Sequence, residues 1–403
     1  MKQPRLLVLG ASNTQLPIIL KALELNCFVI TVDNIPDNIG HRHSHQSINC
    51  STADREAVLA YAKDLEIDGI VTFASDIATP TVAYVAGHLN LTACKLSIAE
   101  TLSNKALFRQ FQDRQQLDCP WFFIAQNIDH LNKHYSQLSV PVIFKPADTS
   151  GSRGLVKLDT LNPDLCHHAF RYAQSFSRAN TVSIEEFVEG IDVSGDGFLI
   201  NGQLHALISQ KFKQGFIPTG HYFPTNIKPV DQQRIFSEIE KNCHAIAYFD
   251  GPIDFDVKIS SDRITVIEMS PRLGGNGIPE LIYYSSGIDL IGMTINYALG
   301  KPCNIPEQPD TLRPCASLIF GNDTAGQLNA ITAAEELKNA YPELIECRYN
   351  YQVGDHVPAF EHSGNSLGYA LFYCPPESGY PSMVNRLQAA LQISIEADFK
   401  PSN

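Results

Sequence analysis

The most informative segment of this sequence runs from 253 to 276. It reads Ile253-Asp254-Phe255-Asp256-Val257-Lys258-Ile259, then Ser260-Ser261-Asp262-Arg263, then Ile264-Thr265-Val266-Ile267-Glu268-Met269-Ser270-Pro271-Arg272-Leu273-Gly274-Gly275-Asn276. Apolar and polar residues alternate in the first part, and the central turn residues predict a β-hairpin. Alternate residues of a strand point the same way, so Asp256, Glu268 and Ser270 can share one face of that hairpin.

Two carboxylates side by side repel each other unless a cation lies between them. Asp256 and Glu268 therefore predict a metal site, with Ser270 as a third oxygen ligand, because Mg²⁺ prefers oxygen ligands and bridges to substrate phosphates. Arg272 follows the second strand, where its guanidinium can contact a carboxylate or a developing acyl phosphate. A solvent-exposed hairpin with ordinary charges is the alternative, and the particular sequence from Glu268 to Asn276 favours the functional interpretation.

A second segment suits phosphate binding. It reads Phe144-Lys145-Pro146-Ala147-Asp148-Thr149-Ser150-Gly151-Ser152-Arg153-Gly154, a predicted strand with one lysine that leads into a loop rich in Gly and Ser. Backbone N–H groups of such a loop can approach phosphate oxygens closely, because glycine adds no side chain. The segment is not a Walker loop, since G-x-x-x-x-G-K-[ST] is absent. A flexible hairpin turn with an exposed lysine explains it equally well.

A third segment mixes apolar and acidic residues at the end of a predicted strand. It reads Val182-Ser183-Ile184-Glu185-Glu186-Phe187-Val188-Glu189-Gly190-Ile191-Asp192. The edge of such a strand can offer backbone groups to an adenine ring, while a carboxylate reaches the ribose hydroxyls. An acidic surface strand is the commoner explanation for this pattern alone.

The first ninety or so residues alternate between strand and helix patterns, which predicts a parallel sheet covered on both faces. The expected strands are Leu6–Leu9, Phe28–Val32 and Gly69–Phe73, and the expected helices include Ala53–Leu65 and Thr79–Leu89. The first turn, Gly10-Ala11-Ser12-Asn13-Thr14-Gln15, lacks the G-x-G-x-x-G pattern of a dinucleotide site. A nicotinamide oxidoreductase is therefore disfavoured, and the Rossmann-like shape is interpreted as scaffold.

The remaining sequence predicts a mixed α/β and α+β chain in four parts, 1–95, 96–190, 191–300 and 301–403. Further expected elements are a helix at Ser97–Phe111, strands at Trp121–Ile124, Pro141–Lys145, Gly197–Ile200 and Leu204–Ile208, and a helix at Ile288–Leu299. The Pro-rich stretch Lys301-Pro302-Cys303-Asn304-Ile305-Pro306 reads as a linker to a small α+β domain.

Composition narrows the possible classes of function. The chain has 403 residues, a formal net charge of −13, 44% hydrophobic and 18% charged residues, which is typical of a globular protein. The acidic excess argues against nucleic-acid binding, which needs a basic surface. Ten cysteines lie scattered without a C-x-x-C pair, and no apolar stretch reaches the roughly 20 residues of a membrane span. We therefore expect a cytoplasmic protein with reduced cysteines and no membrane association.

Taken together, the three segments resemble the ATP-grasp superfamily in the right order over about residues 5 to 300. That resemblance implies an ATP-grasp fold, in which a Rossmann-like N-terminal domain is followed by two lobes that clamp ATP. It implies ATP as cosubstrate with one or two Mg²⁺ ions, Mn²⁺ being an alternative. Many relatives are dimers, so a homodimer is compatible with it.

The resemblance also assigns roles to individual residues. Lys105, in Ser103-Asn104-Lys105-Ala106-Leu107-Phe108, and Lys145 match the two phosphate-binding lysines, and Ser150, Gly151, Ser152, Arg153 and Gly154 match the mobile phosphate loop. Glu185, Glu186, Phe187 and Val188 match the adenine hinge, and Asp192 matches the ribose carboxylate, where Glu is commoner. Asp256 and Glu268 match the acidic metal ligands, and Ser270 stands where the family usually has Asn. Arg272 matches the arginine of the Glu-x-Asn-x-Arg motif.

Within the superfamily the chain is most similar to carboxylate–amine ligases that join free L-amino acids. The similarity lies in Arg272-Leu273-Gly274-Gly275, in the C-terminal tail, and in Pro218-Thr219-Gly220-His221-Tyr222-Phe223-Pro224. It implies that Arg272, Gly274, Gly275 and His221 contact substrate, with Arg272 and His221 as catalytic groups. The expected reaction activates a small carboxylate as an acyl phosphate, which an amine then attacks. Another ATP-grasp activity, either carboxylation or a purine-type ligation, and a weakly active ATP-binding regulatory protein remain the alternatives.

Overall fold

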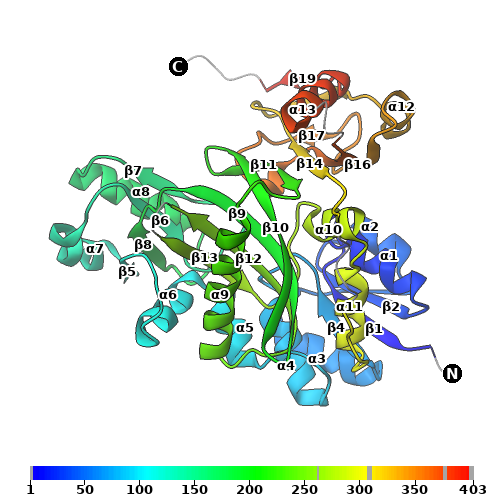
Figure 1. Cartoon of the computed structure of the whole chain (residues 1–403), viewed down its shortest axis with the longest axis horizontal. Helices are drawn as coiled ribbons and strands as arrows, with labels where there is room; N and C mark the ends of the chain where they lie inside the picture. Colours follow the sequence, from blue (N-terminus) through cyan, green and yellow to red (C-terminus); the bar gives the residue numbers. More distant parts are fainter. Residues whose placement is uncertain (1–2, 261–262, 306–310, 375–378, 399–403) are drawn as a thin grey trace.

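The computed structural model describes residues 3–260, 263–305, 311–374 and 379–398. Figure 1 shows an N-terminal part at the lower right, a lobe at the left and a C-terminal part at the top, arranged around a long central sheet. The mixed α/β architecture agrees with the fold class expected from the sequence.

The N-terminal part is a four-stranded parallel sheet with the strand order β3-β2-β1-β4. Its elements are β1 (Arg5–Leu9), α1 (Leu16–Glu24), β2 (Phe28–Asp33), α2 (Ile39–His43), β3 (Gln46–Asn49), α3 (Arg55–Asp64), β4 (Gly69–Thr72) and α4 (Thr79–Leu89). Leu6–Leu9 are fully buried, as expected for a central parallel strand covered on both faces. Strand β3 was not predicted, because only Ile48 of this polar edge strand is buried.

The lobe at the left of Figure 1 holds a four-stranded antiparallel sheet, β5-β8-β6-β7, and is called the β5–β8 lobe below. It comprises β5 (Phe122–Ala125), α7 (Ile128–His134), a short 3₁₀ helix (Tyr135–Gln137), β6 (Val142–Pro146), β7 (Val156–Leu158), α8 (Pro163–Ser175) and β8 (Val182–Glu186). Helices α5 (Leu96–Leu102) and α6 (Lys105–Arg114) connect it to the N-terminal part.

The single helix predicted at Ser97–Phe111 is wrong, because the structure breaks it into α5 and α6. Asn104 is extended at the break, with φ −133° and ψ 115°, and its side chain accepts a hydrogen bond from the Leu107 N–H at 3.1 Å. Asparagine is a favoured N-cap residue, so it starts a new helix here. The break places Lys105 at the first position of α6.

The central sheet has eight antiparallel strands in the order β13-β12-β9-β10-β11-β14-β18-β16. They are β9 (Ile191–Ile200), β10 (Gln203–Gln214), β11 (Ile217–Phe223), β12 (Gly251–Ile259), β13 (Ile264–Ser270), β14 (Cys315–Phe320), β16 (Leu344–Tyr349) and β18 (Gly368–Tyr373). Helices α9 (Pro229–Ala245), α10 (Ile278–Ser286) and α11 (Leu290–Ala298) pack against it. Strands β9 and β10 are longer than predicted, since polar residues interrupt their apolar pattern.

The C-terminal part extends the central sheet through β14, β18 and β16 and adds a small sheet, β17-β15-β19. Its other elements are β15 (Gly326–Ala330), α12 (Ala334–Ala340), β17 (His356–Val357), a 3₁₀ helix (Ser363–Asn365), α13 (Gly379–Ala390) and β19 (Ser394–Ala397). The α+β character expected of this part is confirmed, whereas the boundaries at 95, 190 and 300 remain predictions.

Two predicted features reach beyond the described residues. Pro306, at the end of the expected linker, and Ser261-Asp262, at the centre of the expected hairpin turn, lie outside them. The hairpin itself is present, because β12 and β13 pair and the Ser260 N–H donates to the Arg263 carbonyl at 2.9 Å. The ten cysteines are free, and no helix in the described ranges is long and apolar enough to cross a membrane.

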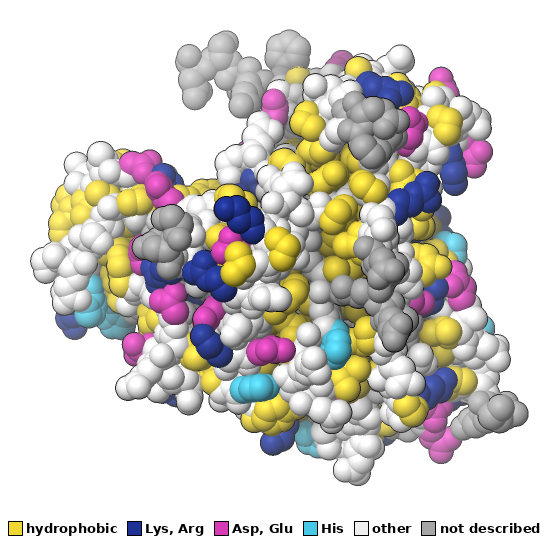
Figure 2. Space-filling model, viewed as in Figure 1, with side chains coloured by type: hydrophobic (Ala, Val, Ile, Leu, Met, Phe, Trp, Pro, Cys, Tyr) yellow, Lys and Arg dark blue, Asp and Glu magenta, His cyan; other side chains and the backbone are white. Residues whose placement is uncertain are grey.

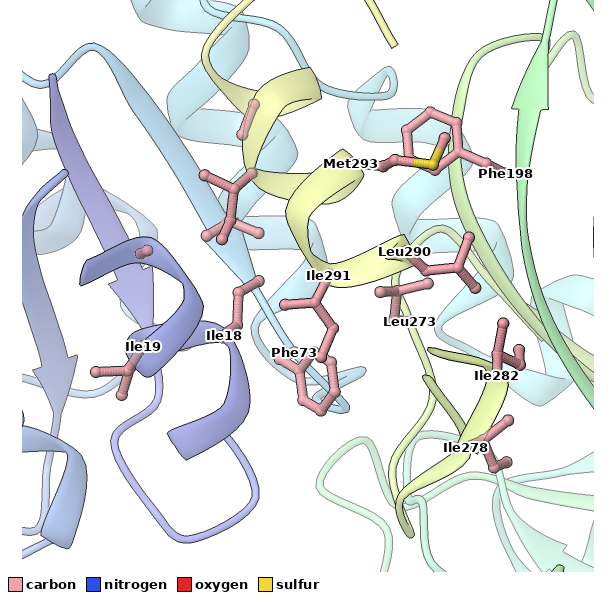
Figure 3. Close-up of a cluster of buried hydrophobic side chains, with 14 of the residues drawn as sticks. Ile18, Ile19, Phe73, Phe198, Leu273, Ile278, Ile282, Leu290, Ile291 and Met293 are labelled. Atoms are coloured by element: carbon pink, nitrogen blue, oxygen red, sulfur yellow. The ribbon is translucent and has the colours of Figure 1, made fainter. Parts of the chain in front are cut away.

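One hydrophobic cluster joins the N-terminal part to the central sheet (Figure 3). Ile18 of α1 and Phe73, just after β4, face Ile291 of α11, while Ile19 belongs to the same cluster on the other side of α1. Leu273 is fully buried in the same cluster, and its carbonyl accepts a hydrogen bond from the Ala74 N–H at 3.1 Å. The loop that follows Arg272 is therefore held firmly against the N-terminal part.

Candidate active site

A large cavity lies between the β5–β8 lobe and the central sheet, and is called the main cavity below. Its empty volume is about 870 Å³, including the part that is open to solvent, which is within the usual range for small-molecule sites. Many of the residues singled out from the sequence line it: Lys105, Lys145, Gly151, Ser152, Arg153, Glu186, Phe187, Val188, Asp192, Asp256 and Glu268. On the face shown in Figure 2, the surface is notched between the β5–β8 lobe and the C-terminal part.

Six cationic side chains converge on the main cavity, although the whole chain carries a net charge of −13. Lys105, Lys145 and Arg153 were predicted, and Lys211, Lys213 and Lys258 were not. Lys211 and Lys213 are alternate residues of β10 and therefore share one face, which is a period-two signal that the sequence does contain. A gathering of cations in an acidic protein suits a polyanionic ligand such as a nucleotide phosphate chain.

Lys145 is positioned by a buried carboxylate. The Glu185 carboxylate is fully buried and accepts hydrogen bonds from Lys145 Nζ at 2.8 Å and Arg109 Nε at 3.1 Å. Burial raises the pKa of Glu185, but Arg109 and Lys145 outweigh that effect and lower it to about 2. Glu185 therefore remains charged and fixes the lysine at the cavity wall.

The structure changes the interpretation of Glu185 and adds Arg109, which the sequence analysis did not single out. The Glu185 side chain does not line the main cavity, so it supports Lys145 in place of the predicted adenine contact. Arg109 was missed, although only 1% of its side chain is exposed. Its guanidinium also donates to the carbonyls of Val266 and Ile267 in β13, at 3.1 and 2.7 Å, and so ties α6 to the β12–β13 hairpin. Nothing in the helical pattern of α6 distinguishes a buried arginine from an exposed one.

The hinge after β8 lines the main cavity with Glu186, Phe187 and Val188. Arg263 donates to Glu186 at 3.1 Å, and Lys258 lies 5.2 Å from the centroid of the Phe187 ring. Asp192, at the start of β9, pairs with Lys213 at 2.8 Å and Lys258 at 3.5 Å. The Phe187 ring and the Asp192 carboxylate thus have Lys258 as a common neighbour at the wall of the main cavity, and their adenine and ribose contacts remain predictions.

The glycine-rich loop at 150–154 follows β6 and contains backbone conformations that favour glycine. Gly151, Ser152 and Gly154 have φ values of 72°, 65° and 70°. A Cβ atom on Gly154 would lie 2.8 Å from both Phe176 and Pro146, so only glycine fits there. Ser152 Oγ donates to the Phe216 carbonyl at 2.8 Å. Gly151, Ser152 and Arg153 line the cavity, whereas Ser150 and Gly154 shape the loop without lining it.

Asp256 and Glu268 lie directly opposite each other on β12 and β13. Lys211 Nζ is 2.6 Å from Asp256, Lys105 Nζ is 3.3 Å from Glu268, and the Ser194 hydroxyl also donates to Asp256. Ser270 lies two residues after Glu268, and its Oγ is buried without a hydrogen-bond partner. The predicted face of two carboxylates and one hydroxyl therefore exists.

These three groups fit a magnesium ion. The buried Ser270 hydroxyl needs a partner, and Mg²⁺ is commonly held by one or two carboxylates together with substrate phosphates. Within the described residues, no group of three or more His, Cys, Asp or Glu side chains forms a complete metal cage. The residues therefore fit an ion whose remaining ligands would come from a bound phosphate.

A smaller inner cavity adjoins the main cavity. It shares Lys105, Thr149 and Glu268 with the main cavity, and it is also lined by Asp76, Asp254, Ser270 and Arg272. Only 8% of Arg272 is exposed. Its Nε and Nη2 donate to Asp76 Oδ1 at 3.0 and 2.6 Å, and its Nη1 donates to Asp254. Arg272, the arginine expected at the reacting carboxylate, thus lines the same cavity as Glu268 and Ser270.

The glycines after Arg272 approach acidic side chains closely. The Gly274 N–H donates to Asp196 Oδ1 at 2.7 Å, while Asp196 Oδ2 is buried without a partner. A Cβ atom on Gly274 would lie 2.7 Å from Asp254 and 2.9 Å from Asp196, and one on Gly275 would lie 3.2 Å from Ala74. Burial raises the pKa of Asp254 to about 7 and raises the pKa of Asp196 strongly. Asp76, Asp196 and Asp254 were not predicted.

His221 is separate from both cavities. It is fully buried in β11 opposite Lys211, and its Nδ1 lies 3.0 Å from Ser209 Oγ. Burial lowers its pKa to about 3, so it is neutral at physiological pH and a poor proton acceptor. The contacts therefore do not bring His221 to the position that a role in acceptor binding or proton transfer would need.

Comparisons with known proteins agree with this geometry. A family model of the ATP-grasp domain matches residues 138–280, which include the glycine-rich loop and the β12–β13 hairpin. The uncharacterized protein y4rH of Sinorhizobium fredii is 24% identical over 346 residues, 83% of this chain and 69% of that protein. Mouse carnosine synthase 1 is 24% identical over 277 residues, which cover 63% of this chain but 33% of that longer protein.

Among solved structures, the L-amino acid ligase of Bacillus licheniformis superposes with a TM-score of 0.82. The match covers 98% of this chain and all of that chain at 20% sequence identity, which shows a shared fold. The family model thus identifies an ATP-grasp domain at residues 138–280, and the structural match shows that the fold is shared over nearly the whole chain.

Proposed function

We propose that the chain joins a small-molecule carboxylate to an amine at the expense of ATP, with an acyl phosphate as the intermediate. The proposal rests on one observation, the shared wall between the main and inner cavities. Lys105 and Glu268 line both of them, so a phosphoryl group in the main cavity would lie next to a carboxylate beside Arg272.

The main cavity would hold ATP. Phe187 and Val188 offer an apolar surface for adenine, and Asp192 lies nearby for the ribose hydroxyls. Lys105, Lys145 and Arg153 would neutralise the phosphate oxygens, and the 150–154 loop would add backbone N–H groups. Asp256, Glu268 and Ser270 would hold one or two Mg²⁺ ions, which neutralise phosphate charge when bound.

The chemistry then needs two transfers. One oxygen of the substrate carboxylate attacks the γ-phosphorus, the bond from that phosphorus to the β–γ bridging oxygen breaks, and ADP leaves. The amine nitrogen attacks the carbonyl carbon of the acyl phosphate, the bond from that carbon to the phosphate oxygen breaks, and the nitrogen loses a proton. Arg272 would hold the carboxylate in line, because a guanidinium matches the geometry of a carboxylate.

The substrates have a route into the site. An outer cavity lined by Arg55, Glu100, Asp148 and Arg178 shares Asp76 and Ser103 with the inner cavity. Charged side chains of both signs line this outer cavity, as a path for zwitterions would require. The likeness to mouse carnosine synthase 1 and to an L-amino acid ligase also supports amino acids as substrates.

The test is release of ADP from ATP and Mg²⁺ in the presence of free amino acids and small amines, supplied singly and in pairs. We expect release that requires one carboxylate, accelerates with one amine and disappears in Glu268→Ala. The matched control is Glu240→Ala, which removes a carboxylate from α9, outside all the cavities described above. ADP release that is indifferent to every carboxylate would contradict the proposal, and release that requires bicarbonate or a phosphoribosyl amine would point to another ATP-grasp reaction.

A further inference from the structure

Two oppositely charged side chains, one in α10 and one in β16, each keep one buried atom without a partner. Glu280 lies in the first turn of α10 and Arg348 lies in β16. Glu280 Oε2 and Arg348 Nη1 are both buried and accept or donate no hydrogen bond. An unpaired buried charge of either sign costs free energy, so both atoms suit a polar ligand.

The surroundings of these two atoms come from separate parts of the chain. Tyr369 of β18 lies opposite Arg348, with the guanidinium carbon 5.7 Å from its ring centroid, and its hydroxyl interacts with Glu280. Arg348 Nε donates to Glu346, and 17% of the arginine side chain is exposed. Asn13 Nδ2 donates to the Tyr349 carbonyl at 3.3 Å, so the first turn of the N-terminal part closes against β16.

The charges indicate what kind of ligand would fit. A simple anion would pair with Arg348 but would be repelled by Glu280 and Glu346. A simple cation would pair with Glu280 and leave Arg348 Nη1 unsatisfied. A zwitterion supplies an ammonium for Glu280 and a carboxylate for Arg348, and so satisfies both atoms at once.

Glu280 is also linked to the groups around Arg272. Asp196 interacts electrostatically with both Glu280 and Arg272, and its Oδ1 accepts the Gly274 N–H at 2.7 Å. Asp196 therefore connects Glu280 to the Arg272 end of the site. Helix α10, which begins just after the Gly274–Gly277 loop, packs against β14, and β18 lies between β14 and β16 in the central sheet.

We propose that Glu280 and Arg348 hold the amine substrate as a zwitterionic amino acid, with its nitrogen at Glu280 and its carboxylate at Arg348. This inference rests on the proposed ligase function and narrows the amine to one that bears a carboxylate. Burial raises the pKa of Glu280 to about 7, although Arg348 acts against that rise. A bound ammonium would favour the charged carboxylate, as an amine-binding role requires.

The test compares each amino acid of the panel with its carboxamide, which has the same amine but no carboxylate. ADP release is measured with the wild-type enzyme, Arg348→Gln and Arg348→Lys. In Arg348→Gln we expect KM for the amino acid to rise about 10- to 100-fold, the usual loss for a charge-assisted hydrogen bond, while KM for the carboxamide stays unchanged. Arg348→Lys keeps the positive charge, so its KM for the amino acid is expected to lie between the wild-type value and that of Arg348→Gln.

Arg313→Gln is the matched control, because Arg313 is an exposed arginine in the same part of the chain, where it stacks on Tyr373. It is expected to leave both KM values unchanged. Glu280→Gln is expected to raise KM for the amino acid and its carboxamide alike, since both present the same nitrogen. Equal rises for acid and carboxamide in Arg348→Gln, or no rise for either, would overturn the inference.

Hydroxylamine separates this inference from the proposed function, because it traps an acyl phosphate without needing an amino acid site. Wild-type enzyme and Arg348→Gln are expected to form hydroxamate from the activated carboxylate at the same rate. If hydroxamate forms in both and the acid–carboxamide difference is absent, the amino acid site is wrong and the ligase remains. If neither forms hydroxamate from any carboxylate, the proposed function fails, and the inference fails with it.

Discussion

Lys145 and Glu185 form an ion pair of 2.8 Å in which the carboxylate has no exposed surface. Arg109 completes the arrangement at 3.1 Å from the same oxygen, Glu185 Oε2. The lysine that faces the main cavity is thus held by a residue behind the cavity wall. Such buried groups tolerate the loss of a partner poorly, because the remaining charges are left uncompensated.

Replacing Glu185 by glutamine tests this dependence. Glu185→Gln leaves Lys145 and Arg109 buried together without a carboxylate, and we expect the free energy of unfolding to fall by about 3–5 kcal/mol. Denaturant unfolding at pH 7 measures the change. Glu186→Gln is the matched control, because the Glu186 side chain is 34% exposed and pairs with Arg263. This substitution should lower the free energy of unfolding by less than about 1 kcal/mol. Similar losses in the two variants would contradict the buried pair.

The same carboxylate predicts a pH dependence of stability. The pKa of Glu185 is lowered from 4.5 to about 2, so between these values the unfolded chain binds a proton that the folded chain does not. Its contribution of about 3 kcal/mol is therefore fully present above about pH 4.5 and is lost as the pH falls towards 2. We expect the stability difference between wild type and Glu185→Gln to be about 2 kcal/mol smaller at pH 3 than at pH 7. A difference that is constant with pH would show that Glu185 is not ionised in the fold.

The glycine-rich loop offers a test of its shape. Gly154→Ala places a Cβ atom 2.8 Å from Phe176 and Pro146 at a φ of 70°. We expect a loss of about 2–4 kcal/mol in unfolding free energy, from left-handed strain together with overpacking, and a higher KM for ATP. Gly215→Ala isolates the strain, because Gly215 has a φ of 60° but no atom near its Cβ position. If Gly215→Ala lowers the free energy of unfolding as much as Gly154→Ala does, overpacking at Gly154 is not the cause.

Much of the fold follows from local patterns. The buried strand at Leu6–Leu9 and the hairpin that brings Asp256 opposite Glu268 both have the expected period and turn. Lys145 and the Gly- and Ser-rich loop after it were also singled out from the sequence segment, and Lys145, Gly151, Ser152 and Arg153 line the main cavity. The helix break at Asn104 was missed, because the apolar pattern continues across it and only the capping hydrogen bond reveals it.

The unpredicted part of the site depends on long-range contacts. Arg109 meets Glu185 across 76 residues, and Arg272 meets Asp76 across 196 residues. No local period marks Arg109 or Asp76, since each is an ordinary charged residue until the fold brings it to its partner. His221 is the opposite case, because its motif indicated a substrate contact, whereas in the structure it is fully buried opposite Lys211 on the neighbouring strand.

Ser270 provides a test of the metal site. Its hydroxyl is buried without a partner two residues after Glu268, where the family that the sequence resembles usually has asparagine. The Asn side chain reaches further and offers a carbonyl oxygen, so we expect Ser270→Asn to lower the Mg²⁺ concentration needed for half-maximal ADP release. Thermal unfolding without Mg²⁺ checks that the larger side chain fits. If Mg²⁺ dependence and turnover are both unchanged, Ser270 does not belong to the metal site.

The central claim is that a substrate carboxylate is phosphorylated before the amine attacks. Once the panel has identified that carboxylate, it can be supplied with ¹⁸O in both carboxylate oxygens, and the released phosphate can be analysed by mass spectrometry. An acyl phosphate intermediate predicts one ¹⁸O atom in each phosphate, because the oxygen that attacks the γ-phosphorus leaves with it. Phosphate without ¹⁸O during productive ligation would contradict the account, since the carboxylate oxygen would then never have been bonded to phosphorus.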